Sequence, residues 1–348
     1  MNTTPSDAAG TLALTDLYHG WLTGLVLATS LHEGPDAAGD MIFKVYRRHH
    51  ENRFLSSFDK LGLSGLPHAV ACARYHYLSN SIGGVRVEYM EESPRKAWVR
   101  FAYPRWIYEG SALCGVPVSV SRGMLKGWYG QNGVSLKNDR LAFVCTSEDM
   151  GDGYGLAGYF IERDEPVGEK GRLVFSLDER PPPFEPAKAP VLDPSAWTEE
   201  RLVKARLTYS VDPVKLALLA MAELFGRSRT EEIASRAARI IGLQSYAAVA
   251  TAIADVEAGA QGYLAFHATL GACHGDQFDL GEDDRGPYLE QRGWRFGRGL
   301  DVEQDLVARC WAALWSGLAT SHDRNLVLVA QSLPIEASSV FRWRVKSA

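Results

Sequence analysis

The sequence lacks the features that would direct it into or across a membrane. Its first ten residues, "MNTTPSDAAG", place no basic group ahead of an apolar core. The apolar run "WLTGLVLATSL" at 21–31 is shorter than the roughly 20 residues of a membrane span. We therefore expect a cytoplasmic protein with no membrane partner.

A disulfide framework and a strongly basic surface are also missing. The five cysteines are odd in number and widely spaced, which predicts free thiols. With 37 basic and 42 acidic residues, the formal net charge of -5 offers no polycationic surface to a phosphate backbone. We expect no nucleic-acid partner.

Several sequence signatures of common enzyme classes do not occur. The chain has no G-K-[ST], no G-x-S-x-G and no H-E-x-x-H, and its Gly-rich "GDGYGLAG" at 151–158 lies between two expected strands and not ahead of a helix. The sequence therefore does not indicate a dinucleotide-binding protein, a P-loop protein, an α/β-hydrolase or a zincin. The identity of any cofactor stays unknown.

The pattern that is present predicts an α+β fold in two parts. Six prolines in the 18 residues "DERPPPFEPAKAPVLDPS" predict a linker at 179–196. We expect one domain at 11–178 and another at 197–348, because 348 residues exceed the usual size of a single domain.

The N-terminal half opens with helical patterns and continues with strands. Helices are expected at 11–31, 36–61 and 67–81, followed by a hairpin of "GVRVEYMEE" and "KAWVRFAY". The segments expected to extend the sheet are "GVPVSV", "LAFVCTS", "LAGYFIE" and "RLVFSL".

The C-terminal half repeats this order of elements. The expected helices are 198–209, 213–226, 229–242, 244–270 and 302–320, with a Gly-rich polar stretch before the last and a hairpin after it. The closing "NLVLVAQSLPIEASSVFRWRV" aligns with "GGVRVEYMEESPRKAWVRFAY", which favours an internal duplication of a helices-then-antiparallel-hairpin unit. The alternative is that two unrelated α+β segments align by chance.

The stretch "PRWIYEGSALCG" at 104–115 groups residue types that could form an active site. Arg105 offers a planar fork for a carboxylate, and Trp106 and Tyr108 offer apolar walls for a substrate. Glu109 could move a proton, and Cys114 could act as the nucleophile. In the alternative interpretation Cys114 is a buried, space-filling thiol and the loop is a structural anchor.

The third expected helix supplies a candidate base. His68, Cys72 and His76 recur every four residues and share one helix face. Three ligands spread over a rise of about 12 Å cannot all reach one zinc ion. We interpret His76 as a general base, with a hydrogen-bonded, semi-buried histidine as the alternative.

Two further groups of polar residues complete the sequence-based assignment. Asn132, in the turn "QNG", is a candidate substrate-binding residue, whereas His49 and His50 are expected on a solvated helix face. In "GACHGD", the spacing of Cys273, His274 and Asp276 matches no standard metal pattern. We expect this loop to border the same pocket, with His274 binding substrate, and keep a metal site as the alternative.

The first half resembles the L-2-amino-thiazoline-4-carboxylic acid hydrolase-like family and, more distantly, small-molecule-binding domains of the vinyl-4-reductase type. Gly83 and Gly84, the strand Trp98 to Phe101, Trp106 and Cys114 carry the resemblance, with the terminal "VFRWRV". It covers residues 20–120 and the final hundred. It implies a pocket between helices and sheet for a small polar ring, with hydrolysis of a C–N bond, whereas the insertion 115–178 departs from a single small domain.

The main hypothesis is a small-molecule hydrolase acting on a non-peptide C–N bond, in which Arg105 holds a carboxylate and Cys114 attacks. The first alternative is a non-catalytic binding or regulatory module that uses the same pocket. The second alternative is a metal-dependent lyase or hydrolase that uses His274 and Asp276. The small-molecule partner is not identified, and a homo-oligomer is compatible with the sequence.

Overall fold

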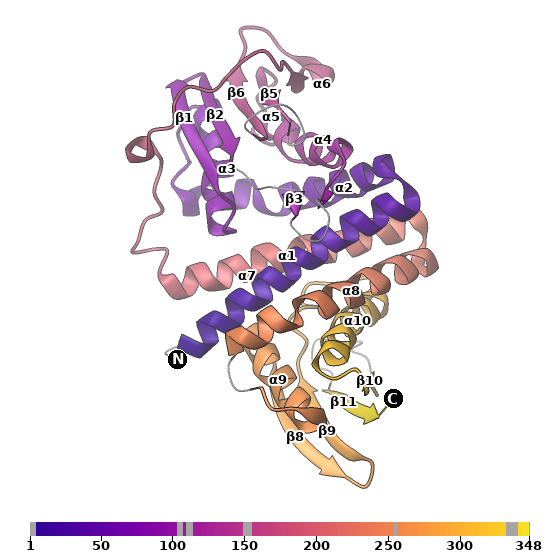
Figure 1. Ribbon diagram of the computed structural model, residues 1–348. Coiled ribbons are helices and arrows are strands. Elements are labelled where there is room, and N and C mark those ends of the chain that lie inside the picture. The colour runs from indigo at the N-terminus through magenta and orange to yellow at the C-terminus, as the bar shows by residue number, and fades with distance from the viewer. Residues whose placement is uncertain are drawn as a thin grey trace. The chain divides into compact units, whose positions relative to one another are not determined.

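The computed structural model describes residues 5–102, 107–108, 114–148, 155–253, 256–331 and 340–347. It confirms the α+β class (Figure 1). The helices are α1 (Pro5–Glu33), α2 (Pro35–Arg53), α3 (His68–Ile82), α4 (Val118–Gly127), α5 (Asn132–Ser135), α6 (Gly168–Gly171), α7 (Glu199–Phe225), α8 (Arg227–Ile253), α9 (Gly259–His274) and α10 (Gln304–His322). The strands are β1 (Val87–Ser93), β2 (Lys96–Phe101), β3 (Ile107–Tyr108), β4 (Cys114–Gly115), β5 (Leu141–Ser147), β6 (Ala157–Glu162), β7 (Leu173–Phe175), β8 (Gln277–Asp283), β9 (Gly286–Arg292), β10 (Leu326–Ala330) and β11 (Val340–Ser347).

The chain divides into two compact units whose boundaries differ from the expected ones. One, here the continuous unit, comprises residues 29–202. The other, here the split unit, combines residues 1–28 with 203–348. The first helical segment therefore groups with the C-terminal half, because its side chains pack there. Within the described residues, no helix has the length and apolar character needed to cross a membrane.

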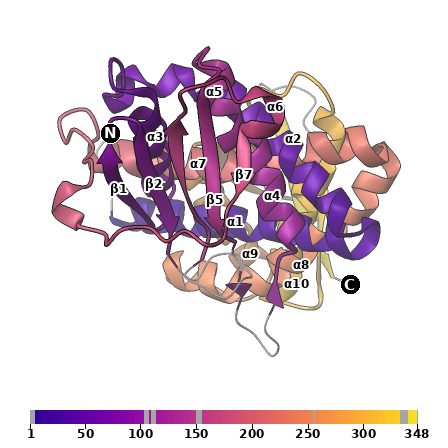
Figure 2. The same ribbon diagram turned by 90° about the horizontal axis from the view of Figure 1, so that it is seen from above.

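The continuous unit contains a five-stranded sheet in the order β1-β2-β6-β5-β7. Its pairs are antiparallel except for β7, which runs parallel to β5. Helix α3 packs on β1, β2 and β6, and α4 crosses α2. Figure 2 shows the strands side by side in front of these helices.

The Pro-rich segment expected to be a linker contributes to the continuous unit. Phe184 packs against a cluster that includes Trp98 and Tyr159. Phe160, the neighbour of Tyr159, stacks on His76 of α3, so the cluster lies on the opposite face of the sheet. The Tyr159 hydroxyl donates a hydrogen bond of 2.7 Å to Glu179. Prolines cannot extend a strand ladder, so this segment contacts the sheet through its side chains.

The split unit has a four-stranded antiparallel sheet in the order β10-β11-β9-β8. Helix α9 packs on β8, β9 and β11, and α10 packs on β10. Read from the other edge, this order matches β1-β2-β6-β5 of the continuous unit. By strand order the closing hairpin, β10 and β11, takes the place of β5 and β6, whereas the sequence alignment pairs it with β1 and β2. The duplication itself stays a prediction.

Three expected element types or breaks differ from the structure. "GVPVSV" forms only the end of β4 and then begins α4, because Pro117 sets the backbone at the helix start. The Gly-rich polar stretch forms the β8–β9 hairpin, whose turn closes with Gly286 at a φ of 95°. The expected break near residue 212 is absent, because α7 continues through Pro213.

Other helix boundaries shifted. Helix α2 ends at Arg53 and is followed by two short 3₁₀ turns, so the expected helix 36–61 is too long. "QNG" lies in a 3₁₀ turn that leads into α5. The break expected between 242 and 244 lies instead after Ile253, because Gly242 is part of α8.

His49 and His50 are buried, which corrects the expectation of a solvated face. The His50 ring stacks on Phe54 with centroids 4.5 Å apart, and its Nε2 is hydrogen-bonded to the Ser135 hydroxyl at 2.8 Å. The reason is the close crossing of α2 and α4, where Gly127 leaves no room for a side chain. This face of α2 is therefore an internal surface despite its polar residues.

Candidate functional site

The loop proposed as the active site is only partly described. Arg105, Trp106 and Glu109 lie outside the residues that the structure describes. Tyr108 and Cys114 lie opposite each other in the short β3–β4 ribbon, of which the backbone alone is described. The nucleophile role of Cys114 and the binding roles of its neighbours therefore stay predictions.

His76 and Asn132, both predicted site residues, meet in the interior of the continuous unit. The Asn132 amide donates a hydrogen bond of 2.9 Å to Nε2 of His76, which places the ring proton on Nδ1. The His76 ring stacks on Tyr129 with centroids 3.7 Å apart and planes at 15°. The contact joins residues 56 positions apart in the sequence.

The surroundings of His76 keep its ring neutral. It has 0% exposed surface, and burial lowers the pKa of the imidazole well below its usual 6.5. The nearby Cys72 is also fully buried, and burial raises the pKa of its thiol, opposed by a hydrogen bond with Asn132. Neither a thiolate nor an imidazolium is favoured there, and Nδ1 of His76 has no hydrogen-bond partner among the described residues. The general-base role of His76 stays a prediction.

His274 is half-buried in the split unit. The Tyr18 hydroxyl is 3.3 Å from Nδ1 of His274 and accepts a hydrogen bond of 3.4 Å from Trp311. Burial lowers the pKa of His274 to about 3, so it is neutral. Asp276 is also buried and accepts a hydrogen bond of 2.9 Å from Gln291. No group of three or more metal-ligating side chains occurs in the described part of the chain.

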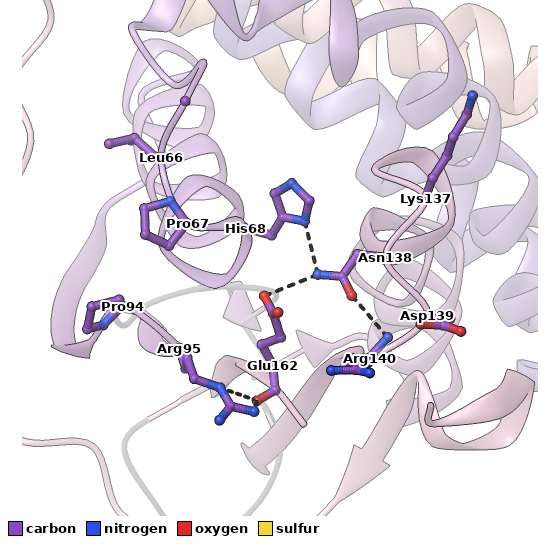
Figure 3. Close-up of a pocket in the computed structure, with 11 residues that line it drawn as sticks. Leu66, Pro67, His68, Pro94, Arg95, Lys137, Asn138, Asp139, Arg140 and Glu162 are labelled. Carbon is purple, nitrogen blue, oxygen red and sulfur yellow. Dashed lines mark hydrogen bonds between the residues drawn. The ribbon is translucent and has the colours of Figure 1, made fainter. Parts of the chain in front are cut away.

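A surface depression of about 670 Å³ lies in the continuous unit, at the start of α3. Three segments border it: the approach to α3, the β1–β2 turn, and the connection into β5 with the end of β6. We call it the basin, and Figure 3 shows its lining. The lining residues are Gly65, Leu66, Pro67, His68, Pro94, Arg95, Lys137, Asn138, Asp139, Arg140 and Glu162.

Asn138 organises the polar wall of the basin. Its amide nitrogen donates to Nδ1 of His68 at 2.9 Å and to Oε2 of Glu162 at 3.1 Å (Figure 3). Its side-chain oxygen accepts a hydrogen bond of 3.0 Å from the backbone N–H of Arg140. One side chain thus fixes a helix start, a strand end and a turn relative to one another.

The basin carries more cationic than anionic groups. The cationic groups that line it are Arg95, Lys137 and Arg140, and the carboxylates are those of Asp139 and Glu162. The Arg95 guanidinium is engaged, since it donates to the Glu162 carbonyl oxygen at 2.8 Å and forms an ion pair with Asp164. Figure 3 shows the Lys137 side chain directed away from the other groups.

Arg140 and the start of α3 are the groups best placed to receive an anion. Among the described residues, no ion pair or hydrogen bond engages the Arg140 guanidinium. Pro67 precedes α3 and provides no side-chain cap to the first N–H groups of the helix. Both features leave donors available beside the cavity.

Only one part of the basin's lining could be anticipated from the sequence. His68 was noticed as one of three residues on a helix face, but nothing marked "KNDR" at 137–140 as a wall. The polar residues "KND" are typical of an exposed turn. In the structure, Lys137 in this turn has a φ of 53°, in the left-handed region. Its approach to α3 results from the tertiary fold.

Comparisons with known proteins add no relatives: no family model, no curated protein and no solved structure matches this chain. The resemblance to the hydrolase-like family therefore stays a prediction.

Proposed function

We propose that the continuous unit is a small-molecule-binding module and that its basin holds a small polar molecule carrying a carboxylate. The observation that carries this proposal is the Arg140 guanidinium, without an ion-pair partner in the described residues, beside a cavity of about 670 Å³. A guanidinium binds a carboxylate through two parallel hydrogen bonds. The uncapped N-terminus of α3 adds a favourable dipole.

The mixed charge of the wall narrows the ligand class. Glu162 accepts one hydrogen bond from Asn138 and keeps further acceptor capacity toward the basin. Leu66, Pro67 and Pro94 add apolar surface. A compact molecule that carries a hydrogen-bond donor, such as an amine, beside its carboxylate can pair with both Glu162 and Arg140. A polyanion would be repelled by the carboxylates of Asp139 and Glu162.

Four buried thiols and imidazoles among the described residues argue against catalysis at their own positions. Cys72 and Cys310 are buried, and burial raises the pKa of Cys310 to about 11. His76 and His267 are buried and neutral. A nucleophile requires a thiolate that a substrate can reach, and neither condition holds at these positions. The hydrolase hypothesis, which depends on Cys114, stays a prediction.

The test is calorimetric titration of the full chain with two probes: L-proline and 2-amino-thiazoline-4-carboxylic acid, the acid that gives the resembled family its name. We expect saturable binding of at least one probe and an affinity at least tenfold lower in Arg140→Ala, because a charge-assisted pair contributes about 1.5–3 kcal/mol.

Arg163→Ala is the matched control, since Arg163 is exposed and directly follows Glu162 in the chain but does not line the basin. It should bind as the wild type does. Equal affinity in the wild type and Arg140→Ala, or no binding of either acid, would refute the proposal. Analysis of the mixture for ring-opened product separates a binder from a hydrolase.

A further inference from the structure

The two sheets share a strand order, but they differ at one edge. In the continuous unit, β7 lies beside β5 at the edge of the sheet. In the split unit, strand β10, which has the position of β5, is itself the edge strand. In the part of the chain that the structure describes, no strand pairs with the outer edge of β10. The strand β7 on β5 is therefore an example of what can bind at the outer edge of β10.

The β5 edge is occupied through identifiable backbone groups. Phe143 and Cys145, which flank Val144 in β5, direct backbone groups away from β6 and toward β7. The Phe143 N–H donates a hydrogen bond of 2.9 Å to the Arg172 carbonyl. The Cys145 carbonyl accepts a hydrogen bond of 2.9 Å from the Ser176 N–H. These bonds hold β7 parallel to β5.

The β10 edge presents the same groups. The Gln331 N–H donates a hydrogen bond of 2.8 Å to the Arg342 carbonyl. The backbone groups of the odd-numbered residues of β10 therefore form the hydrogen bonds to β11. Leu328 and Ala330 therefore direct their N–H and C=O groups away from β11. Phe143 and Cys145 of β5 direct their backbone groups outward in the same way.

The side chains of β10 indicate an apolar occupant. Edge strands are usually protected by charge or proline, and the opposite edge β8 carries Asp279, Glu282 and Asp283. Strand β10 reads "LVLVA" and has no charge, and Val327 is 45% exposed. The segment that covers β5 is similarly apolar, "LVF".

We propose that the outer edge of β10 binds an extended, apolar segment of a partner protein as a parallel fifth strand. Backbone bonds at Leu328 and Ala330 supply the affinity, and contact with Val327 selects an uncharged segment. This surface is independent of the basin and of the function proposed for it.

A labelled synthetic peptide with the sequence of residues 170–178, "KGRLVFSLD", is the probe, and fluorescence anisotropy with the full chain is the measurement. We expect saturable binding to the wild type and at least tenfold weaker binding to Ala330→Pro. Proline at this position removes an outward N–H and leaves the bonds to β11 intact, so the melting temperature and circular dichroism should be retained.

Val327 supplies a matched pair of variants. Val327→Lys should weaken binding of the peptide, whereas Val327→Thr, of similar shape and uncharged, should preserve it. Absence of peptide binding at 1 mM, or equal binding by wild type and Ala330→Pro, would overturn the proposal. A concentration-dependent dimer that Ala330→Pro dissociates would also overturn it, because the edge would then pair with a second copy of this chain.

Discussion

Asp276 is the buried carboxylate with the clearest consequence for stability. It is 6% exposed, and its oxygens accept hydrogen bonds from the Gln291 side chain at 2.9 Å and the Arg295 backbone N–H at 2.8 Å. Burial raises its pKa from 3.8 to about 6, against the opposing effect of these bonds and of the Arg295 charge. The charge of Asp276 at neutral pH therefore costs stability.

This shift predicts a pH dependence that Asp276→Asn abolishes. Because the folded state binds the proton more tightly, the stabilisation is complete below about pH 4 and is lost as the pH rises through 6. Relative to the variant, the wild type should lose up to about 3 kcal/mol between pH 4 and pH 7. Urea unfolding across this range measures it. Asp279→Asn, an exposed carboxylate on β8, controls for the lost charge. A wild-type-minus-variant difference that does not change with pH contradicts the prediction.

At the scale of elements, each unit contains a pair of helices that cross at glycines. Helices α2 and α4 meet at Gly39 and Gly123, and α8 and α10 meet at Gly242 and Gly317. At Gly317 a Cβ atom would overlap the Arg239 carbonyl and would lie 3.0 Å from the Gly242 Cα. Backbone approach this close excludes any side chain.

Gly317→Ala is therefore expected to destabilise the split unit by about 1–3 kcal/mol, because the helices must move apart. Gly20→Ala is the control in the same unit, since its Cβ would lie an ordinary 3.7 Å from Ile241. That change should be neutral or stabilising by up to about 1 kcal/mol, through helix propensity. Thermal unfolding of both variants distinguishes them, and equal melting temperatures would count against the packing argument.

At the scale of the whole molecule, the split unit depends on a helix that the sequence assigns to the other half. Tyr18 on α1 contacts His274 and Trp311, and its ring lies 5.3 Å from that of Phe296. Gly24 of α1 approaches Ile241 of α8. The core of this unit is therefore incomplete without residues 1–28.

A fragment of residues 197–348, the C-terminal domain expected from sequence, should fail to unfold cooperatively. Joining residues 1–28 to 203–348 through a flexible linker should restore a cooperative transition and the near-ultraviolet circular dichroism of packed Tyr and Trp rings. Thermal melts of the two chains provide the comparison. A cooperative melt of the shorter fragment would show that α1 is dispensable.

The local sequence was sufficient for elements whose pattern is short-range. The alternation in "VEYMEES" and "KAWVRF" predicted the β1–β2 hairpin, and Pro67 marked the start of α3, because both signals arise within a few residues. It was insufficient for "GVPVSV", where β-branched residues favoured a strand but the crossing of α4 with α2 favoured a helix.

By itself the sequence determined the α+β class and most helix and strand identities, since hydrophobic periodicity is carried by neighbouring residues. Only the tertiary structure decided which residues meet: Asn132 with His76, Tyr18 with His274 at a separation of 256 residues, and Asn138 with His68 at the basin. Burial and hydrogen bonding depend on such distant partners. Such distant contacts also place His76 and His274, two predicted site residues, in surroundings that favour the neutral imidazole.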